Sequence, residues 1–340
     1  MELEKKSKSE LVDICRQLKL KGFSNKSKLQ LIDMIQAKSE VEVKPFLKWV
    51  GGKTQIIEQV ISSFPIEMNN YYEPFLGGGS VLLALLHNVN KGSIKINGNI
   101  YASDANQNLI NLYKNIQSRC DDVMEELKKI IEEFNSCRED GVNREPNTIQ
   151  EATASKESYY YWIRKRYNQL GKSDTVMCSA MFIFLNKTCF RGMYREGPNG
   201  FNVPYGNYKN PSVFDETQLR ETSKLIKNVT FSSYSFTEAL KLVHEKDFVY
   251  LDPPYAPENL KSFVGYTSEG FKIENHKELF KLTNELRNKN INLLMSNADV
   301  EMVKEAFSSS NYNIKSILCK RAINSKNPNA MTNELLIKSY

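Results

Sequence analysis

Strand-forming and helix-forming segments alternate along most of the 340-residue chain, and this alternation restricts its fold more than any other feature. The apolar runs YYEPFL, IYASD and DFVYLDPPY are each followed by a longer run with helical spacing of apolar residues. Parallel strands need long crossover connections, which helices supply. The pattern therefore predicts an α/β fold with a doubly wound sheet. The last two runs, YNIKSILCKRA and NELLIKSY, predict an antiparallel hairpin at one sheet edge.

The composition is that of an ordinary globular protein, with 41% apolar and 25% charged residues. The net charge of +6 permits a polyanionic partner but does not establish one, because the charges are widely spread. The N-terminal segment MELEKKSKSE has no apolar core, and the chain has no run of about 18 apolar residues. We therefore expect no secretory signal, no membrane span and an intracellular location.

The six cysteines are scattered along the chain. They form no C-x-x-C pair and no ligand-like cluster with the three histidines. Scattered thiols of this kind fit a reducing compartment, and we expect no metal site.

Residues 1–40 are expected to form a separate small helical unit. Leu11 and Ile14 lie at helical spacing after the candidate cap Ser9, and Leu29 and Ile32 are expected to face inward from a second helix. Two short helices with lysines around their joint resemble a SAP domain, which is a DNA-binding module. The alternative is a helical hairpin with a solvated basic rim.

A glycine-rich turn joins a predicted strand to a predicted helix in YYEPFLGGGSVLLALL. Gly77, Gly78 and Gly79 permit positive φ angles and a close approach of the backbone to a ligand. Asp104 ends the next predicted strand, 25 residues after Gly79, where an acid can hydrogen-bond ribose hydroxyls. The spacing departs from G-x-G-x-x-G, so an adenosyl ligand without phosphates fits better than a dinucleotide.

The segment VYLDPPY ends a predicted buried strand in two prolines. Pro253 and Pro254 forbid helix and remove two backbone donors, which makes the turn stiff and extended. Such a turn can present the Asp252 carboxylate, a carbonyl group and the Tyr255 ring to one planar ligand. The alternative is a rigid exit from the strand with no chemical role.

Four blocks in this order, FLKWVGGK, EPFLGGGS, NKTCFRGMYREGPNGFNVPYGNYK and VYLDPPY, resemble the Dam-type (alpha-group, D12-class) DNA adenine-N6 methyltransferases over residues 45–340. The resemblance implies a Rossmann-like seven-stranded methyltransferase sheet that uses S-adenosyl-L-methionine as methyl donor. It also implies a cofactor-binding part (45–115), a target-recognition region of helices and a hairpin (116–225), and a catalytic part (226–340). Gly78 departs from many relatives, which have alanine or another small residue there, and we expect this departure to be harmless.

The resemblance also implies the site residues. In catalysis, the Asp252 carboxylate and the Pro253 carbonyl would each accept an N–H from the amine of a flipped adenine, and Tyr255 would stack on the base. Pro254 completes the catalytic set. The expected cofactor-binding residues are Trp49, Lys53, Glu73, Phe75, Gly77, Gly79, Asp104 and Asp252.

The segment 186–209 combines cationic and aromatic residues, a mixture that suits DNA contact. REGPNGF is expected to form a hairpin tip, and its likeness to GATC-reading relatives predicts recognition of GATC. Arg321 and Lys326 are expected at backbone phosphates. The expected DNA-binding residues are Lys187, Arg191, Tyr194, Arg195 and Asn202.

The predicted function is methyl transfer to adenine N6 in double-stranded DNA by base flipping. A monomer is expected, with a cognate restriction endonuclease as a candidate partner. One alternative is a DNA-binding scaffold that lacks activity. The other is a methyltransferase for RNA, a protein amide or cytosine N4, whose relatives more often carry Asn or Ser in place of Asp252.

Overall fold

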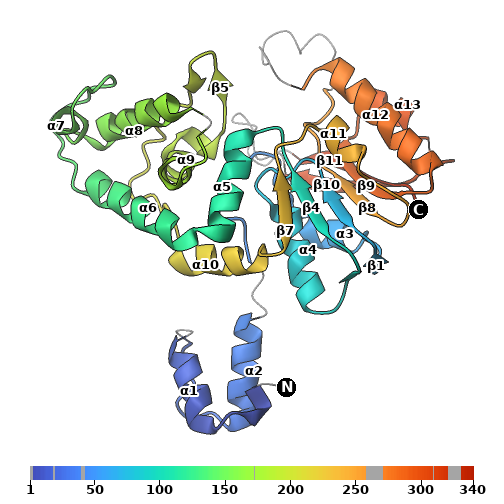
Figure 1. Ribbon diagram of the computed structural model, residues 1–340, viewed down its shortest axis with the longest axis horizontal. Coiled ribbons are helices and arrows are strands. Elements are labelled where there is room, and N and C mark those ends of the chain that lie inside the picture. Colours follow the sequence, from blue (N-terminus) through green and yellow to red (C-terminus); the bar gives the residue numbers. More distant parts are fainter. Residues whose placement is uncertain are drawn as a thin grey trace. The chain divides into compact units, whose positions relative to one another are not determined.

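The computed structural model (Figure 1) falls into two compact units, Met1–Val43 and Lys44–Tyr340, which are described separately. Arg321 and Lys326, expected at DNA phosphates, lie outside the described residues. The structure describes residues 3–17, 20–39, 43–171, 173–257, 271–308, 310–320 and 331–340.

The N-terminal unit contains η1 (Leu3–Lys5), α1 (Lys8–Gln17) and α2 (Lys28–Ser39). Its two α-helices pack through a small apolar core. Ser7, rather than the expected Ser9, is the N-cap residue of α1. Its backbone N–H donates to the Glu10 carboxylate at 2.7 Å, and its hydroxyl accepts from the Glu10 N–H at 3.3 Å.

The expectation that Leu29 faces inward is wrong, because its side chain is 73% exposed. The buried face of α2 instead contains Leu31, Ile32 and Ile35. Ser27 caps this helix by accepting the Gln30 N–H at 3.2 Å.

A seven-stranded sheet forms the centre of the second unit, in the order β10-β11-β9-β8-β2-β4-β7. Strand β11 is antiparallel to both β9 and β10, and the other neighbouring strands are parallel. The predicted doubly wound sheet with an antiparallel hairpin at one edge is confirmed. The strands are β2 (Tyr71–Glu73), β4 (Ile100–Ser103), β7 (Val229–Ser232), β8 (Phe248–Leu251), β9 (Asn292–Ala298), β10 (Asn313–Lys320) and β11 (Met331–Lys338).

The chain order along this sheet reverses next to β2. From β2 the chain moves outward through β4 to β7, and then returns to β8 on the other side of β2. In open α/β sheets, ligands bind outside the carboxyl ends of the strands at such a reversal. The fold therefore directs attention to the residues that follow β2, β4 and β8.

Both faces of the sheet are buried, as the apolar composition of β8 requires. Phe248 and Tyr250 contact the Phe64 ring with centroids 4.7 and 5.6 Å apart, whereas Val249 and Leu251 join a core with three helices on the opposite face. Those helices are α11 (Phe236–Leu240), α12 (Ile273–Asn288) and α13 (Glu301–Ala306). Phe64 follows α3 (Ile57–Ile61), which packs near α4 (Ser80–Asn90).

A helical region and a short hairpin lie beside the sheet (Figure 1). Helices α6 and α8 both pack against α9. The hairpin pairs β5 (Glu196–Gly197) with β6 (Gly200–Phe201), so the expected hairpin at REGPNGF is confirmed. The remaining elements are η2 (Lys53–Gln55), β1 (Glu67–Met68), β3 (Lys95–Ile96), α5 (Gln107–Ser118), α6 (Cys120–Asn135), α7 (Ile149–Ala152), α8 (Lys156–Leu170), α9 (Val176–Thr188), η3 (Phe190–Gly192) and α10 (Glu216–Leu225).

In the part of the chain that the structure describes, every helix is too short or too polar to cross a lipid bilayer.

Candidate active site

Three carboxylates gather at the carboxyl ends of the strands around the reversal. Glu73 is the last residue of β2, Asp104 follows β4, and Asp252 follows β8. These strands are direct neighbours in the sheet, so their ends lie side by side. Burial raises the pKa of Glu73 most, and the charges of Asp252 and Asp104 raise it further, which places the three groups in one electrostatic cluster.

The glycine-rich turn after β2 is bound to this cluster through its backbone. The Gly77 N–H donates to the Asp104 carboxylate at 3.0 Å. Gly77 and Gly79 have φ angles of +50° and +69°, which residues with a Cβ atom rarely adopt. A Cβ atom at Gly79 would also lie 2.5 Å from the Tyr113 hydroxyl oxygen. Glycine is therefore required at the start of α4.

Trp49 packs directly on the glycine turn. A Cβ atom at Gly78 would lie 2.7 Å from the Trp49 Cβ, and one at Gly77 would lie 2.9 Å from the indole Cδ1. Trp49 therefore fills the space that a side chain at Gly77 or Gly78 would occupy. The absence of a side chain at Gly78 leaves space for Trp49.

Lys53 and Asp252 form a buried ion pair. The Lys53 Nζ lies 2.7 Å from the Asp252 Oδ1, and their side chains are 3% and 18% exposed. The same ammonium donates to the Gly51 carbonyl at 2.7 Å, and the Lys53 N–H donates to the Ser80 hydroxyl at 3.1 Å. Lys53 therefore joins the segment before α3, the start of α4 and the turn after β8.

Burial makes this cluster electrostatically unusual. It raises the pKa of Glu73 to about 8, against the hydrogen bond from the Tyr71 hydroxyl at 2.7 Å, which lowers it. Burial also raises the pKa of Asp104 and, against the opposing effect of Lys53, that of Asp252. Among the described residues, only Asp252 of these three acids forms an ion pair.

Two aspartates against one ammonium leave a surplus of negative charge, to which Glu73 adds when it ionises. S-adenosylmethionine carries a sulfonium and an ammonium group, so the residues present fit this cofactor. Glu73, Asp104 and Asp252 supply carboxylates, and Trp49 supplies an aromatic face on the glycine turn. The structure brings these expected cofactor residues together with Lys53.

The charge on Glu73 should make the unliganded protein less stable at high pH. The folded-state pKa of about 8 lies above the ordinary value of 4.5. The contribution of protonated Glu73 to the free energy of unfolding is therefore complete below about pH 4.5. It is lost as pH rises through 8, by about 1.4 kcal/mol for each pKa unit. We expect E73Q to be more stable than the parent by a few kcal/mol at pH 8.5 but not at pH 4.5.

Thermal unfolding of both proteins at these two pH values would measure the difference. The matched control is E58Q, an exposed glutamate on α3, which should follow the parent protein. An equal stability difference between E73Q and the parent at both pH values would contradict the assignment.

Phe75, an expected cofactor residue, lies in an aromatic group beside this cluster. Its ring stacks on Phe236 with centroids 5.7 Å apart and meets the edge of Phe271 at 5.8 Å. Phe75 therefore belongs to the face covered by α11 and α12. The described contacts do not join it to Lys53 or Asp252.

The two prolines of the turn after β8 lie in different environments. Pro253 is buried, Pro254 is exposed and Tyr255 is half-buried. The Lys53 ammonium lies over the Tyr255 ring, 4.9 Å from its centroid. Asp252 and Tyr255 are thereby held against the same lysine, on two sides of the proline pair.

The expected DNA-binding residues divide into separate groups. Arg195 and Asn202 are exposed and pair with each other across the hairpin, with the Arg195 Nε donating to the Asn202 Oδ1 at 2.7 Å. Arg191 is exposed and has a φ angle of +57° in the turn after α9. Lys187 is half-buried, and burial lowers its pKa to about 8.

Tyr194 lies apart from this exposed group. Its ring stacks on Trp49 and Phe182, with centroids 5.5 and 5.2 Å away, and its hydroxyl donates to the Glu196 carboxylate. The Asn108 side chain donates to the same hydroxyl at 3.5 Å. These contacts place the Tyr194 ring against Trp49, and its expected role in DNA binding stays a prediction.

Two residues that the sequence did not indicate contact the proline turn from the last strands. The Tyr255 hydroxyl donates to the Glu334 carboxylate at 2.7 Å, and the Ala256 N–H donates to the Asn297 side-chain oxygen at 3.0 Å. They lie 79 and 41 residues along the chain from their partners. No local motif marks either residue, so only the strand pairing reveals them.

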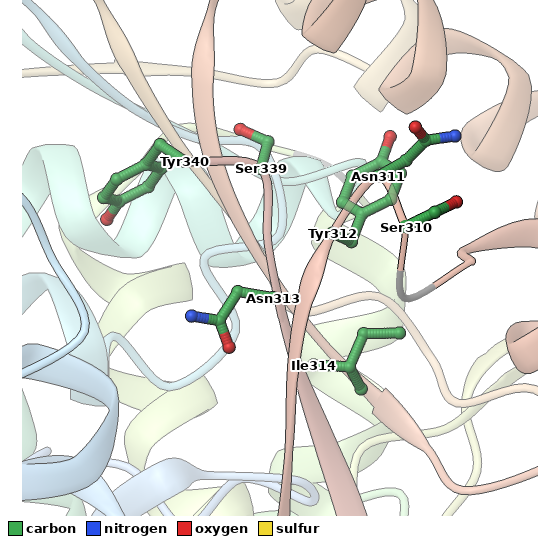
Figure 2. A pocket seen from close by; sticks show the side chains of 7 residues that line it. All are labelled: Ser310, Asn311, Tyr312, Asn313, Ile314, Ser339 and Tyr340. Atoms are coloured by element: carbon green, nitrogen blue, oxygen red, sulfur yellow. The ribbon is translucent and has the colours of Figure 1, made fainter.

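A hollow of about 520 Å³ lies at the other end of the sheet (Figure 2). It is next to the start of β10 and the end of β11, whereas the acid cluster lies at the carboxyl ends of the parallel strands. The described side chains that line it carry hydroxyl, amide and apolar groups. The lining residues are Ser310, Asn311, Tyr312, Asn313, Ile314, Ser339 and Tyr340.

The sheet and the acid cluster together define a Rossmann-like methyltransferase. The model of one family, described as D12 class N6 adenine-specific DNA methyltransferase, matches residues 49–323. The chain belongs to this family, which transfers methyl groups to adenine N6 in DNA. Membership implies S-adenosylmethionine as the methyl donor.

Full-length relatives agree with this assignment. The chain is 38% identical over 311 residues to the type II methyltransferase M.MjaIII of Methanocaldococcus jannaschii, with 88% of this chain and 100% of that protein covered. It is 29% identical over 310 residues to the type II methyltransferase M1.LlaDCHI of Lactococcus lactis subsp. cremoris, with coverages of 89% and 98%. The DNA adenine methylase of Escherichia coli K12 is 28% identical over 264 residues, with coverages of 77% and 83%.

Proposed function

We propose that this chain is an active, site-specific methyltransferase that modifies adenine N6 within GATC in double-stranded DNA. The observation that supports activity most directly is the buried pair of Lys53 and Asp252, 2.7 Å apart, beside Tyr255. A buried ion pair costs desolvation energy that a purely binding protein has no need to spend. GATC rests on the likeness of the recognition segment to GATC-reading relatives.

The proline turn would hold the target base in a productive orientation. The adenine amine is a weak nucleophile, because its lone pair is delocalised into the ring. The second oxygen of Asp252 and the Pro253 carbonyl would each accept one N–H and so direct the lone pair outward. Tyr255 would stack on the flipped base. Bound S-adenosylmethionine supplies a methyl group that is already electrophilic, so positioning carries most of the catalysis.

Glu73, Asp104 and Trp49 would hold the donor. The two carboxylates balance the cationic groups, and Asp104 also has the position of an acid that binds ribose hydroxyls. In the structure, the Asp104 carboxylate accepts the N–H groups of Gly77 and Asn106 at 3.0 and 2.9 Å. The same acid therefore sets the shape of the glycine turn against which the donor would lie.

Exposed cations beside the hairpin are the DNA contacts that we propose. Arg191 and Arg195 would meet phosphates or guanine edges, and Asn202 would fix the Arg195 fork through the 2.7 Å hydrogen bond across the hairpin. Burial lowers the pKa of Lys187 in the free protein, and the negative charge of a nearby phosphate would raise it again.

Transfer of labelled methyl groups from S-adenosylmethionine to unmethylated duplex DNA tests this function, followed by mapping of the modified bases. We expect N6-methyladenine confined to GATC. The same modified base at another sequence would overturn the recognition assignment alone. Methylation of an RNA or protein amide, with none on DNA, would contradict the DNA substrate, and cofactor binding without any transfer would favour the scaffold.

A cognate restriction endonuclease is the partner that we propose, and a monomer is the proposed active form. Two relatives are named type II methyltransferases, a name used for enzymes of restriction–modification systems. A monomer is sufficient because one catalytic site acts on one flipped base at a time.

We further propose that the N-terminal unit adds DNA affinity without sequence preference, as its likeness to a SAP domain implies. Deletion of residues 1–43 should weaken DNA binding while leaving the methylated sequence unchanged. Each lost phosphate contact should reduce the slope of log K against log salt by about 0.9. Binding titrations at several salt concentrations would measure this slope.

The full-length variant K21Q/K26Q is the matched control for the deletion. It keeps the core of the unit, which contains Leu11 and Leu31, and removes two lysines near the joint of the helices. It should reproduce part of the change in slope. A truncated protein that methylates a different sequence would contradict the proposal.

A further inference from the structure

Glu334 contacts the proline turn from a strand that the catalytic motif does not include. It lies on β11, opposite Ala298 of β9 and Ile317 of β10. Its carboxylate accepts the Tyr255 hydroxyl at 2.7 Å, and the carboxylate is half-buried. Hydrogen bonds from a neutral donor to a carboxylate are stronger and more directional than neutral pairs.

The neighbouring strand β9 holds the next residue of the same turn. Asn297 is fully buried and accepts the Ala256 N–H at 3.0 Å. Asn297 pairs in register with Leu335, the residue after Glu334. The antiparallel pair of β9 and β11 therefore fixes the backbone of the turn at one point and the Tyr255 side chain at another.

Tyr255 is consequently held at one face of its ring and at its hydroxyl group. The Lys53 ammonium lies 4.9 Å from the ring centroid, and the Glu334 carboxylate holds the hydroxyl. Burial raises the pKa of Tyr255, so the phenol keeps its proton and remains the donor. The hydroxyl thus acts as an anchor for the ring, and proton transfer from it is not required.

We propose that Glu334 is a positioning residue that sets the plane of the Tyr255 ring on which the target adenine stacks. The inference rests on the proposed function, because it concerns the same base-binding turn. A phenylalanine ring would stack as well as a tyrosine ring, but it would have no anchor at its far end. A base displaced by about 1 Å can lose roughly 100-fold in rate.

Two substitutions at Glu334 distinguish the effect of side-chain length from the effect of its charge. E334Q keeps the length of the side chain and an oxygen acceptor, whereas E334D keeps the charge but withdraws it by one methylene. We expect E334Q to retain kcat within about threefold, and E334D to lose about 10- to 100-fold in kcat with little change in KM for the cofactor. The opposite pattern would overturn the proposal, because it would show that charge rather than position matters.

Combination with Y255F tests whether Glu334 acts through the tyrosine. Y255F alone should resemble E334D, and E334D should cause no further loss in the Y255F background. Losses that multiply in the double variant, or a Y255F protein with full activity, would overturn the inference. N333A, an exposed neighbour on β11, is the matched control and should behave like the parent.

Fluorescence of 2-aminopurine at the target position gives a readout that loss of stability would not reproduce. E334D and Y255F should still flip the base, but with altered fluorescence that reports weaker stacking on the ring; unchanged fluorescence in both would overturn the proposal. The activities of the parent protein and of D252A separate a failure of the proposed function from a failure of the positioning role of Glu334. If the parent methylates a substrate other than DNA adenine, the proposed function fails, and the E334D and Y255F comparison is then made on that substrate.

Discussion

D252A should lose methyl transfer by at least roughly 10²- to 10³-fold, the effect of removing one electrostatic group that acts in the transition state. Asp252 supplies the oxygen that would orient the adenine amine, and the described structure places no other carboxylate in the proline turn. The loss should fall on kcat rather than on KM for DNA. Single-turnover methylation of a duplex with one target site would measure it.

Removal of Asp252 also leaves Lys53 without its partner in a buried position, which can destabilise a protein by about 3–5 kcal/mol. D252N is therefore the necessary companion, because it preserves the volume and one oxygen. It should stay folded and bind DNA, yet lose most of its activity, since an amide accepts hydrogen bonds more weakly than a carboxylate. Substantial activity in both variants would contradict the role assigned to this acid.

Those parts of the site that depend on a few consecutive residues were predictable from the sequence. The glycine turn needs positive φ angles at Gly77 and Gly79, and only glycine adopts them freely. The proline pair allows the backbone after β8 few conformations. The alternation of strands and helices was sufficient to predict the doubly wound sheet, because parallel strands allow few connections.

Contacts between distant segments were not predictable in this way. Tyr194 lies in a basic, aromatic stretch that is typical of DNA contact, but packing places its ring on Trp49 and Phe182. Leu29 lies three residues before the buried Ile32 and is nevertheless exposed, because the face of α2 that packs on α1 contains Leu31, Ile32 and Ile35. Glu334 reaches Tyr255 only through the register of β9 and β11.

K53M should be the second most damaging substitution, and its defect should depend on pH. Lys53 lowers the pKa of Asp252 against the larger effect of burial, which raises it. Without the ammonium, the pKa of Asp252 rises further, so a larger fraction of the acid is protonated at neutral pH. A protonated carboxyl group is a poorer acceptor for the adenine amine. We expect an activity loss of roughly 10²- to 10³-fold at pH 7, the effect of losing one electrostatic group that acts in the transition state.

The pH profile separates this electrostatic role from simple loss of structure. In K53M, the acid limb of kcat/KM should move to higher pH, and activity should recover partly as the pH rises and Asp252 ionises. K53R keeps the charge and is the matched control; its acid limb should stay close to that of the parent, even if its bulk lowers the rate. A K53M profile that is lower at every pH, with an unmoved acid limb, would show that Lys53 acts through packing alone. Lys53 also lies over the Tyr255 ring. Such a result would therefore indicate that its contact with Tyr255 matters more than its ion pair with Asp252.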